Sequence, residues 1–530
     1  MLWSFFFEKI LQSIEEKRIV VMNYKNACLF SAFLAVCYAA PAETVYFGGA
    51  LIGDTSNADN SWSTESNWLL EDKSEYGKLP QEGDNIVIDG NYLTFGTGNP
   101  RLFMLSDSGS FGKLILQNFN SGTSSKSIQL ATPASNTLTF TGIDFVRNAN
   151  SGNAVIGLTT GVSAQATIIV NGDVNAGSPD DVGVKGNLEF GAGGDQTFSG
   201  WGGPKKISVS GDFNLYGTNC NFNVGVGSED GNSGNATYDN PDISIGGVFN
   251  MAYANGTYPT VFLNQRGSGV SNGLRTKYIL NTVIGVGGLQ GGGVITNNTN
   301  NTAYNWGKGS ATIVFNNAKG SSYTFSGQIN DDTKKTSIPT TETVTKLVMR
   351  GEGTQILEGE TMLFSGGVEV QNGTLKLNYK DATNHGDLIM IGGRFGNVSG
   401  SSSTNVNFTN LIYSGGVIES RWDGSSLDVI NLSGGLKKGD SFGEGDSFLI
   451  AISGDLGSML NSEMKIISWD NLTNATDFSD SDFSLENGEA SFAIKSDGLY
   501  ITVTAVPEPS AVCAVFGVLA LAFAYLRRKR

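Results

Sequence analysis

The chain has 530 residues, of which 71 are glycine and 16% are charged, and its net charge is −16 at pH 7. Aromatic residues make up 10% of the sequence, enough to fill a core, so a highly charged disordered chain is excluded. The acidic balance argues against nucleic acid and anionic membrane surfaces as partners, because both would repel it. With His385 as the single histidine, an H-E-x-x-H zinc site is excluded too.

Residues 1–42 end in the pattern of an export signal. Lys25 supplies a positive charge, residues 27–38 are largely apolar, and Ala40-Pro41-Ala42 has the A-x-A form of a signal-peptidase site. Cleavage after Ala42 would leave Glu43 as the first residue of the mature protein.

The start of this signal is open to two interpretations. Residues 1–21 are amphipathic and fit an export signal poorly, so Met22 is an alternative start to Met1. An uncleaved N-terminal anchor is less favoured, because residues 27–38 are too few to span a bilayer.

The body that follows, residues 43–345, has the pattern of many short β-strands. Polar and apolar residues alternate, or apolar residues form short runs, and each run ends at Gly, Asn or Ser. This pattern predicts an all-β body. The clearest predicted strands are residues 45–47, 85–89, 113–117, 127–130, 137–140, 167–170 and 206–209.

A weak repeat occurs within this body. Three segments share a strand, a glycine turn, an apolar residue and an asparagine, at intervals of 39 and 36 residues. Such intervals occur in solenoids and propellers, but a regular four-strand signature typical of a propeller is absent from the sequence. In stacked coils, Asn175, Asn214 and Asn250 would form a hydrogen-bonded ladder between strands about 4.8 Å apart. Chance recurrence in a chain rich in Gly and Asn is the alternative.

Residues 346–435 contain the most distinct unit. Its strands end at Gly or Asn-Gly, and it includes Gly366-Gly367-Val368 and Gly373-Thr374-Leu375-Lys376-Leu377. This unit resembles the autotransporter-associated β-strand repeat, with Phe364-Ser365 where the repeat has a tyrosine. The resemblance implies a right-handed parallel β-helix (β-solenoid).

The two ends of the body have features expected of caps. Trp62, Trp68 and the run 83–88 resemble the opening of exported β-helix proteins, and we expect the tryptophans to cover the first coil. Stacking on carbohydrate is the alternative role for these rings. Residues 436–504 are predicted to form the closing β coils.

Catalytic patterns are scarce. Residues 269–273 have the G-x-S-x-G form, and Ser271 with Asp331 or Asp332 and then His385 follows the order of a hydrolase triad. A nucleophile elbow needs a helix after the serine, whereas residues 274–286 have a strand pattern. Chance occurrence is therefore the preferred interpretation, and we expect no enzyme activity from these residues.

The acidic clusters are expected to be solvated rather than functional. Asp180-Asp181 and Asp331-Asp332 are the adjacent aspartate pairs, and neighbouring residues on a strand point to opposite faces. Asp477, Asp480 and Asp482 are a calcium alternative, but their spacing is not that of an Asp-x-Asp-x-Asp-Gly loop. No cofactor is expected.

Residues 505–530 combine three sorting elements. Pro507, Glu508 and Pro509 interrupt the fold, and the uncharged residues 510–526 would rise about 26 Å as a helix, close to the thickness of a membrane core. The positive residues that follow are expected to stop transfer. They are Arg527, Arg528, Lys529 and Arg530.

This order resembles the PEP-CTERM sorting signal of exported bacterial proteins. The resemblance implies an exosortase-type processing protease as partner, and transient anchoring in the inner membrane by a single transmembrane helix. It also implies a final location at the cell surface, in the outer membrane or in the extracellular matrix.

The sequence therefore predicts an exported structural or adhesin-like β-solenoid, with extracellular polysaccharide or other surface proteins as partners. The alternative is an extracellular polysaccharide lyase or glycoside hydrolase on the same scaffold. A groove lined by Asp, Glu, Lys and Arg with aromatics beside it would favour the enzyme. A uniform Asn, Ser and Thr face would favour the structural protein.

Overall fold

The computed structural model divides the chain into two compact units, residues 1–43 and 44–530. Ala40, the motif at 507–509 and the basic residues 527–530 lie outside the described residues, and Ala42 is exposed. No helix in the described parts is long and apolar enough to cross a membrane. The described residues are 42–51, 62–92, 94–95, 101–103, 108–118, 127–132, 137–146, 155–161, 167–180, 187–190, 201–202, 206–222, 242–254, 257–263, 282–297, 310–331, 344–379, 383–400, 404–470 and 476–506.

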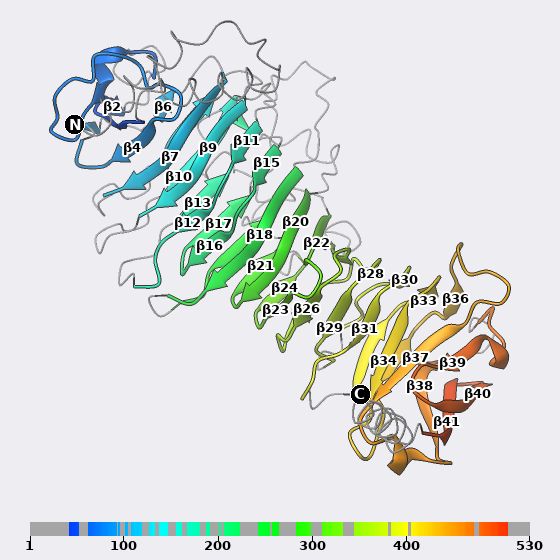
Figure 1. Ribbon diagram of the computed structural model, residues 1–530. Helices are drawn as coiled ribbons and strands as arrows, with labels where there is room; N and C mark the ends of the chain where they lie inside the picture. Colours follow the sequence, from blue (N-terminus) through cyan, green and yellow to red (C-terminus); the bar gives the residue numbers. More distant parts are fainter. Residues whose placement is uncertain are drawn as a thin grey trace, which may run out of the picture. The chain divides into compact units, whose positions relative to one another are not determined.

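The second unit is nearly all β where it is described, as predicted, and its largest sheet has 24 mostly parallel strands (Figure 1). All seven predicted strands are confirmed, and three of them have the predicted bounds at both ends: β4 (Asn85–Asp89), β11 (Thr167–Val170) and β15 (Lys206–Val209). The strands form three ladders, in each of which a strand pairs with its counterpart from the next circuit of the chain. One circuit through ladders 1, 2 and 3 is called a coil below. This arrangement is compatible with a β-solenoid.

Ladder 1 runs through the large sheet from β9 to β36. Long strands such as β9 continue into ladder 2. Its members are β9 (Thr137–Phe145), β11, β15, β18 (Asp242–Ala252), β20 (Thr282–Gly291), β22 (Ala311–Phe315), β25 (Thr345–Met349), β28 (Val368–Val370), β30 (Leu388–Met390), β33 (Leu411–Tyr413) and β36 (Leu436–Lys438).

Ladder 2 belongs to the same large sheet and shares β9, β18 and β20 with ladder 1, and the first residues of β7 also pair with β9 in ladder 1. Its other members are β4, β7 (Gly109–Gln117), β12 (Val174–Ala176), β16 (Phe213–Tyr216), β23 (Ser322–Phe325), β26 (Thr354–Leu357), β29 (Thr374–Leu377), β31 (Arg394–Asn397), β34 (Val417–Arg421), β37 (Phe448–Ser453) and β39 (Phe483–Leu485).

Ladder 3 consists of two separate sheets, and Asn384, which lies in the chain between them, forms a parallel bridge with Asn407 of the second. The first sheet holds β6 (Arg101–Phe103), β8 (Ser127–Thr132), β10 (Val155–Gly161), β13 (Asn187–Phe190), β14 (Trp201–Gly202), β17 (Asn219–Phe222), β19 (Thr260–Leu263), β21 (Val294–Thr296), β24 (Gln328–Asn330) and β27 (Met362–Leu363). The second holds β32 (Asn405–Phe408), β35 (Val429–Leu432), β38 (Glu463–Trp469), β41 (Gly498–Ala505) and β40 (Glu489–Lys495).

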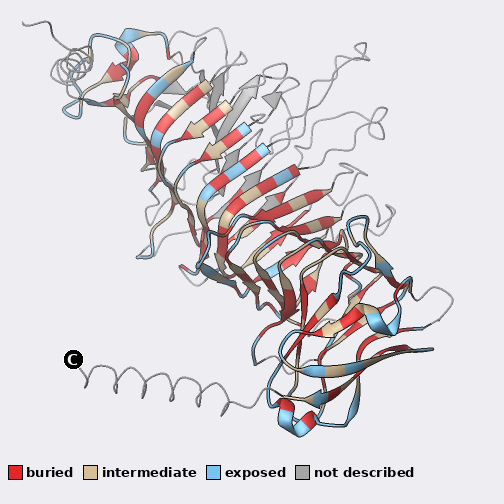
Figure 2. Ribbon diagram, turned by 45° about the vertical axis from the view of Figure 1, so that its right-hand side comes forward, coloured by how far each residue is buried: buried red, intermediate tan, exposed pale blue. Residues whose placement is uncertain are grey.

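Buried residues alternate with less buried ones along many strands (Figure 2), and because successive side chains of a strand point to opposite faces, the core lies between the ladders. Aliphatic residues occupy one inward position of ladder 1 in eleven successive coils, all buried and in register. Such a column stabilises the stack by removing apolar surface from water at each coil. The column is Leu138, Ile168, Ile207, Ile243, Ile284, Ile313, Leu347, Val368, Leu388, Leu411 and Leu436.

The N-terminal end of the stack is closed by aromatic residues. Trp62 and Trp68 are 1% and 0% exposed, and their rings pack against each other and against Phe111 and Phe47. The indole nitrogen of Trp68 donates to the Trp62 carbonyl oxygen at 2.9 Å. The expected cap is confirmed, and the alternative of carbohydrate stacking is wrong because both rings are covered. Short elements surround the cap: β1 (Thr44–Phe47), β2 (Ala50–Leu51), η2 (Glu65–Asn67), β3 (Trp68–Leu69) and β5 (Thr94–Phe95).

The C-terminal end is closed by antiparallel pairing. β38 pairs with β41, and β41 with the edge strand β40. Asp480, in the short helix η7 (Asp480–Asp482), accepts a hydrogen bond from the backbone nitrogen of Ile494 on this edge. A second short helix, η5 (Leu456–Met459), precedes β38. Occupied backbone donors make an edge strand less able to pair with another chain.

Candidate functional site

The predicted asparagine ladder is confirmed on the outer side of ladder 2. Asn250 Nδ2 donates to Asn214 Oδ1 at 3.2 Å, and Asn214 Nδ2 donates to Asn175 Oδ1 at 2.9 Å. Asn175 in turn donates to Asp144 Oδ1 at 2.9 Å, and Lys113 Nζ lies 2.8 Å from Asp144 Oδ2. Because a carboxylate only accepts, Asp144 fixes the direction in which every amide of the ladder points.

The glycine turns of the repeat carry a second set of bonds between coils. Asp173 Oδ1 accepts from the Asp212 backbone nitrogen at 2.8 Å, and Asp212 Oδ1 accepts from the Val248 backbone nitrogen at 2.7 Å. Each acidic turn residue therefore binds the backbone of the following coil. The sequence repeat has a structural cause, since both of its polar positions join neighbouring coils.

A similar ladder forms on the five-stranded sheet. Asn431 Nδ2 donates to Asn407 Oδ1 at 2.9 Å, and Ser468 Oγ donates to Asn431 Oδ1 at 2.5 Å. Sequence reasoning missed this ladder. The signal was present in the shared pattern of an Asn followed directly by an apolar residue, Asn407-Phe408 and Asn431-Leu432.

Ion pairs join the coils of the region resembling the autotransporter repeat. Glu419 Oε1 accepts from Arg394 Nε at 2.7 Å, and its Oε2 accepts from Lys376 Nζ. Arg394 also binds Glu486 through both terminal nitrogens. In register, Gly396 separates Lys376 from Glu419, and a Cβ at Gly396 would lie 2.8 Å from the Glu419 Cβ. Glycine at this position therefore leaves room for the lysine to reach across it.

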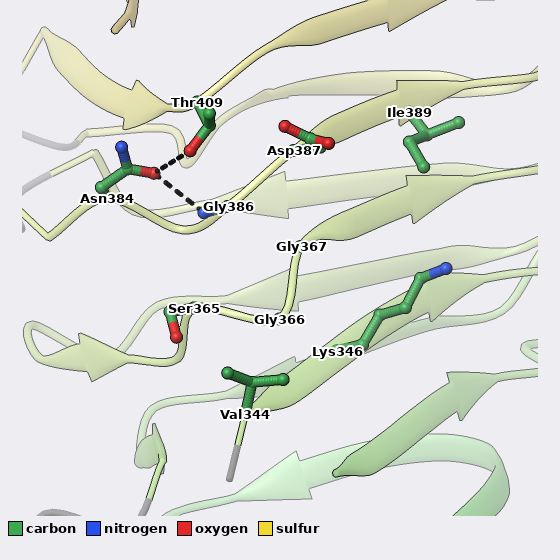
Figure 3. Close-up of a pocket in the computed structure, with 10 residues that line it drawn as sticks. All are labelled: Val344, Lys346, Ser365, Gly366, Gly367, Asn384, Gly386, Asp387, Ile389 and Thr409. Atoms are coloured by element: carbon green, nitrogen blue, oxygen red, sulfur yellow. Dashed lines mark hydrogen bonds between the residues drawn. The ribbon is translucent and has the colours of Figure 1, made fainter. Parts of the chain in front are cut away.

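A groove of about 550 Å³ crosses four coils in the same region (Figure 3). Its floor is the Gly366–Gly367 turn; Ser365 and Asn384 lie on one side of that turn, and Lys346 and Ile389 on the other. The lining residues are Val344, Lys346, Ser365, Gly366, Gly367, Asn384, Gly386, Asp387, Ile389 and Thr409.

Close stacking of turns produces the floor. Gly386 has a φ of +83°, and a Cβ there would lie 2.5 Å from the Ser365 carbonyl oxygen. The backbone nitrogen of Gly367 donates to the His385 carbonyl oxygen, and that of Val368 to the Asp387 carbonyl oxygen. The floor thus has no side chains because the backbones of two coils are in contact there.

Hydrogen bonds hold the polar groups of the groove. Ser365 Oγ donates to Asp331 Oδ2 at 2.6 Å, and Thr409 Oγ1 donates to Asn384 Oδ1 at 3.2 Å. Asp387 Oδ1 accepts from both the backbone and the side chain of Asn410, at 3.1 and 2.8 Å. These side chains are positioned by the scaffold.

Asp331 lies behind Ser365 and is not the solvated loop residue expected from sequence. Its Oδ1 accepts from the Thr345 backbone nitrogen at 2.6 Å. Burial raises the pKa of Asp331, and the hydrogen bonds from Ser365 and Thr345 oppose that rise. The expectation failed because Thr345, fourteen residues further along the chain, begins the next coil and covers the carboxylate.

At the Lys346 side of the groove, Lys346 Nζ lies 2.6 Å from Glu369 Oε2. Burial opposes ionisation of Glu369, but hydrogen bonds from Gln371 and Lys346 lower its pKa overall. The charge of Lys346 is therefore matched by a carboxylate outside the groove lining.

The triad pattern that we attribute to chance is not supported by the position of His385 either. This residue is 1% exposed, its ring stacks on Phe364 at 4.4 Å between centroids, and it contacts Phe408. Its Nδ1 lies 3.2 Å from the Phe364 carbonyl oxygen. His385 is thus a core residue of ladder 3, while Ser271 and Asp332 lie outside the described residues.

The calcium alternative is not supported either. Asp480 binds the Ile494 backbone, and Asp482 binds the Ser479 backbone and lies 3.0 Å from Lys438 Nζ. The hydrogen bond from Ser479 is the main cause of the lowered pKa of Asp482. Within the described ranges, no group of three or more His, Cys, Asp or Glu residues could hold a metal ion. Asp180 lies in the described turn after β12, and Asp181 lies outside the described residues.

A buried polar cluster of Asn397, Arg421 and Asp428 was also missed by sequence reasoning. Asp428 is 2% exposed and accepts from Asn397 Nδ2 at 3.0 Å and from Arg421 Nη2 at 3.2 Å. Burial raises the pKa of Asp428, and its bonds to Asn397 and Arg421 counteract the rise. In the sequence, this cluster is visible only as an arginine and an aspartate, Arg421 and Asp428, on either side of a turn. That pattern is too common to single out a buried cluster.

Comparison of the chain with protein-family models, with curated proteins and with solved structures finds no match in any of the three.

Proposed function

We propose that this chain is an exported structural or adhesin-like protein of the cell surface or extracellular matrix, built as a right-handed β-solenoid. The observation that carries the proposal is the continuous set of hydrogen bonds from Lys113 through Asp144 to Asn250 on the outer face. The side chains of these residues lie on the outer side of a sheet and form hydrogen bonds from one coil to the next. Such bonds between coils suit a stiff scaffold.

The closed ends support the same role. The N-terminal tryptophans cover the first coil. At the other end, β38, β41 and β40 pair in antiparallel fashion, and Asp480 accepts a hydrogen bond from the backbone of the edge strand β40. A stack closed at both ends resists end-to-end polymerisation. The protein would therefore present its sides, rather than its ends, to the surroundings.

Sorting is proposed to proceed through the two terminal signals. A signal peptide ending at Ala42 would direct export, and an exosortase-type protease would process the segment that begins at Pro507. The tail helix would anchor the chain in the inner membrane until processing. The sequence order of these elements supports this step.

A polysaccharide-acting enzyme is the second candidate, and the groove from Lys346 to Thr409 is the observation that favours it. Glycoside hydrolysis generally needs a pair of carboxyl groups on either side of the scissile bond. Among the described residues that line the groove, Asp387 is the one carboxylate. A binding role for the groove is therefore preferred over catalysis.

Deletion of the gene in the native host separates the two candidates. If the protein is structural, the deletion strain loses cell-to-surface or matrix cohesion, while its growth on extracellular polysaccharide is unchanged. Complementation with the wild-type gene should restore cohesion. Loss of growth on polysaccharide with cohesion intact would favour the enzyme instead.

A further inference from the structure

We propose that the groove crossing four coils binds a segment of a neutral, hydroxyl-rich polysaccharide lying parallel to the stack. This inference rests on the proposed function, because it names the partner that a surface scaffold would bind. The three intervals between four coils, at about 4.8 Å each, give a groove length of about 14 Å, enough for a short oligosaccharide segment. The residues that define its two ends are Lys346 and Thr409.

The hydrogen-bonding groups of the groove select for a ligand rich in donors. The hydroxyl protons of Ser365 and Thr409 are already donated to Asp331 and Asn384, so the two hydroxyl oxygens can only accept from a ligand. Asp387 uses Oδ1 for Asn410, and its Oδ2 makes no hydrogen bond to a described residue. Three acceptor-only oxygens thus line the groove. Saccharide hydroxyl groups supply the matching donors.

Charge favours a neutral ligand. Asp387 places a carboxylate in the groove, and the chain carries a net charge of −16, so an acidic polysaccharide would be repelled. Lys346 does not reverse this balance, because Glu369 pairs with it at 2.6 Å.

The shape of the groove is already set before a ligand arrives. The Gly366–Gly367 floor carries no side chains, and the partly exposed Ile389 offers an apolar surface for the C–H face of a sugar ring. Hydrogen bonds to Asn410 and Asn384 hold the acceptors in place. Binding therefore requires little further ordering of the protein.

The test measures binding of the full chain, purified in mild detergent, to neutral and acidic oligosaccharides by calorimetry. The probes are cellohexaose, xylohexaose and mannohexaose, with hexagalacturonate as the acidic counterpart. We expect at least one neutral probe to bind, and hexagalacturonate to bind at least tenfold more weakly.

Asp387→Asn tests the site itself. It turns an acceptor in the groove into a donor while an oxygen remains for Asn410, and we expect affinity to fall about tenfold or more. Asp212→Asn is the matched control, because Asp212 binds the next coil in the same way but lies outside the groove. Thr409→Val, which removes a hydroxyl with little change of shape, should weaken binding to a smaller extent. Circular dichroism checks that the variants are folded.

Two results would overturn the groove as a glycan site: absence of binding by all three neutral probes at millimolar concentration, or equal affinity in wild type and Asp387→Asn. Either could occur in a protein that is still exported and supports cohesion, which would leave the surface role standing. Conversely, the protein could bind a neutral probe in a manner that depends on Asp387 while deletion of its gene leaves cohesion intact. That result would support the groove as a glycan site and refute the structural role at the surface.

Discussion

The coils of the first part of the stack are long, and those after residue 345 are short, yet both fill the same core positions. In ladder 1, Ile243 pairs with Ile284, 41 residues later, whereas Val368 pairs with Leu388, only 20 residues later. All four residues are buried. The number of residues in a coil therefore does not set the core position that its strand occupies.

The two regions differ in how the outer side of ladder 2 is joined. Amides join the long coils there from Asn175 to Asn250, while charged side chains join the short coils through Arg394 and Glu419. Neutral hydrogen bonds depend little on salt, whereas partly exposed ion pairs are screened by it. The stack thus has two kinds of bond between coils, and they differ in their dependence on salt concentration.

The largest expected effect tests the common core. Ile243→Ala in a long coil and Leu388→Ala in a short coil should each lower the free energy of unfolding by about 2–5 kcal/mol, since each leaves a cavity in the same column. Denaturant unfolding of the full chain, followed by circular dichroism, measures both. If only one of the two variants had a lower free energy of unfolding than wild type, the idea of a core shared by both regions would be contradicted.

Loss of a ladder amide should cost less. Asn214→Ala removes two inter-coil hydrogen bonds and should destabilise by about 1–2 kcal/mol, whereas Asn250→Ala removes the single bond to Asn214 and should cost about half as much. The penalty should be the same in low and high salt. Equal penalties for the two variants would argue against a continuous ladder.

The ion pairs of the short coils should contribute still less. Glu419→Gln leaves the fold intact and should destabilise by about 0.5–1 kcal/mol at low ionic strength, because the paired side chains are partly exposed. In 1 M salt the difference from wild type should nearly vanish. A penalty independent of salt would show that packing, and not charge, joins these coils.

The smallest expected effect depends on pH. Because the folded-state pKa of Asp331 is raised, the folded state binds its proton more readily than the unfolded state does. The resulting stabilisation is fully present below the ordinary pKa of an aspartate and is lost as pH rises through the raised value. Wild type should therefore gain stability relative to Asp331→Asn as the pH falls from 7 towards 4. A difference that stays constant over this range would mean that the carboxylate is not perturbed.

Much of the fold could be predicted because its signals are local. Residues 206–209 alternate between polar and apolar, residues 167–170 are mostly apolar, and both segments end at turn residues, which is sufficient to define a strand. The asparagine ladder was predictable for a related reason: each Asn follows its glycine turn at a fixed offset. Equal offsets place these residues at equivalent positions whatever the length of the coil.

The groove could not be predicted, because its residues become neighbours only when coils of unequal length stack. Ser365, Asn384 and Thr409 lie 19 and 25 residues apart in the chain. His385 shows the limit of residue order as evidence: its place in the chain fits a triad pattern that we attribute to chance, and its ring fills the core between Phe364 and Phe408. Burial, not residue type, decides the role of such a side chain.

The central claim, that this stack is an exported surface scaffold, is tested most directly by the intact mass and location of the protein in its native host. The account predicts a surface-located species that begins at Glu43 and ends near Pro509. A variant lacking residues 507–530 should fail to reach that location. A full-length protein retained in the inner membrane would contradict the account.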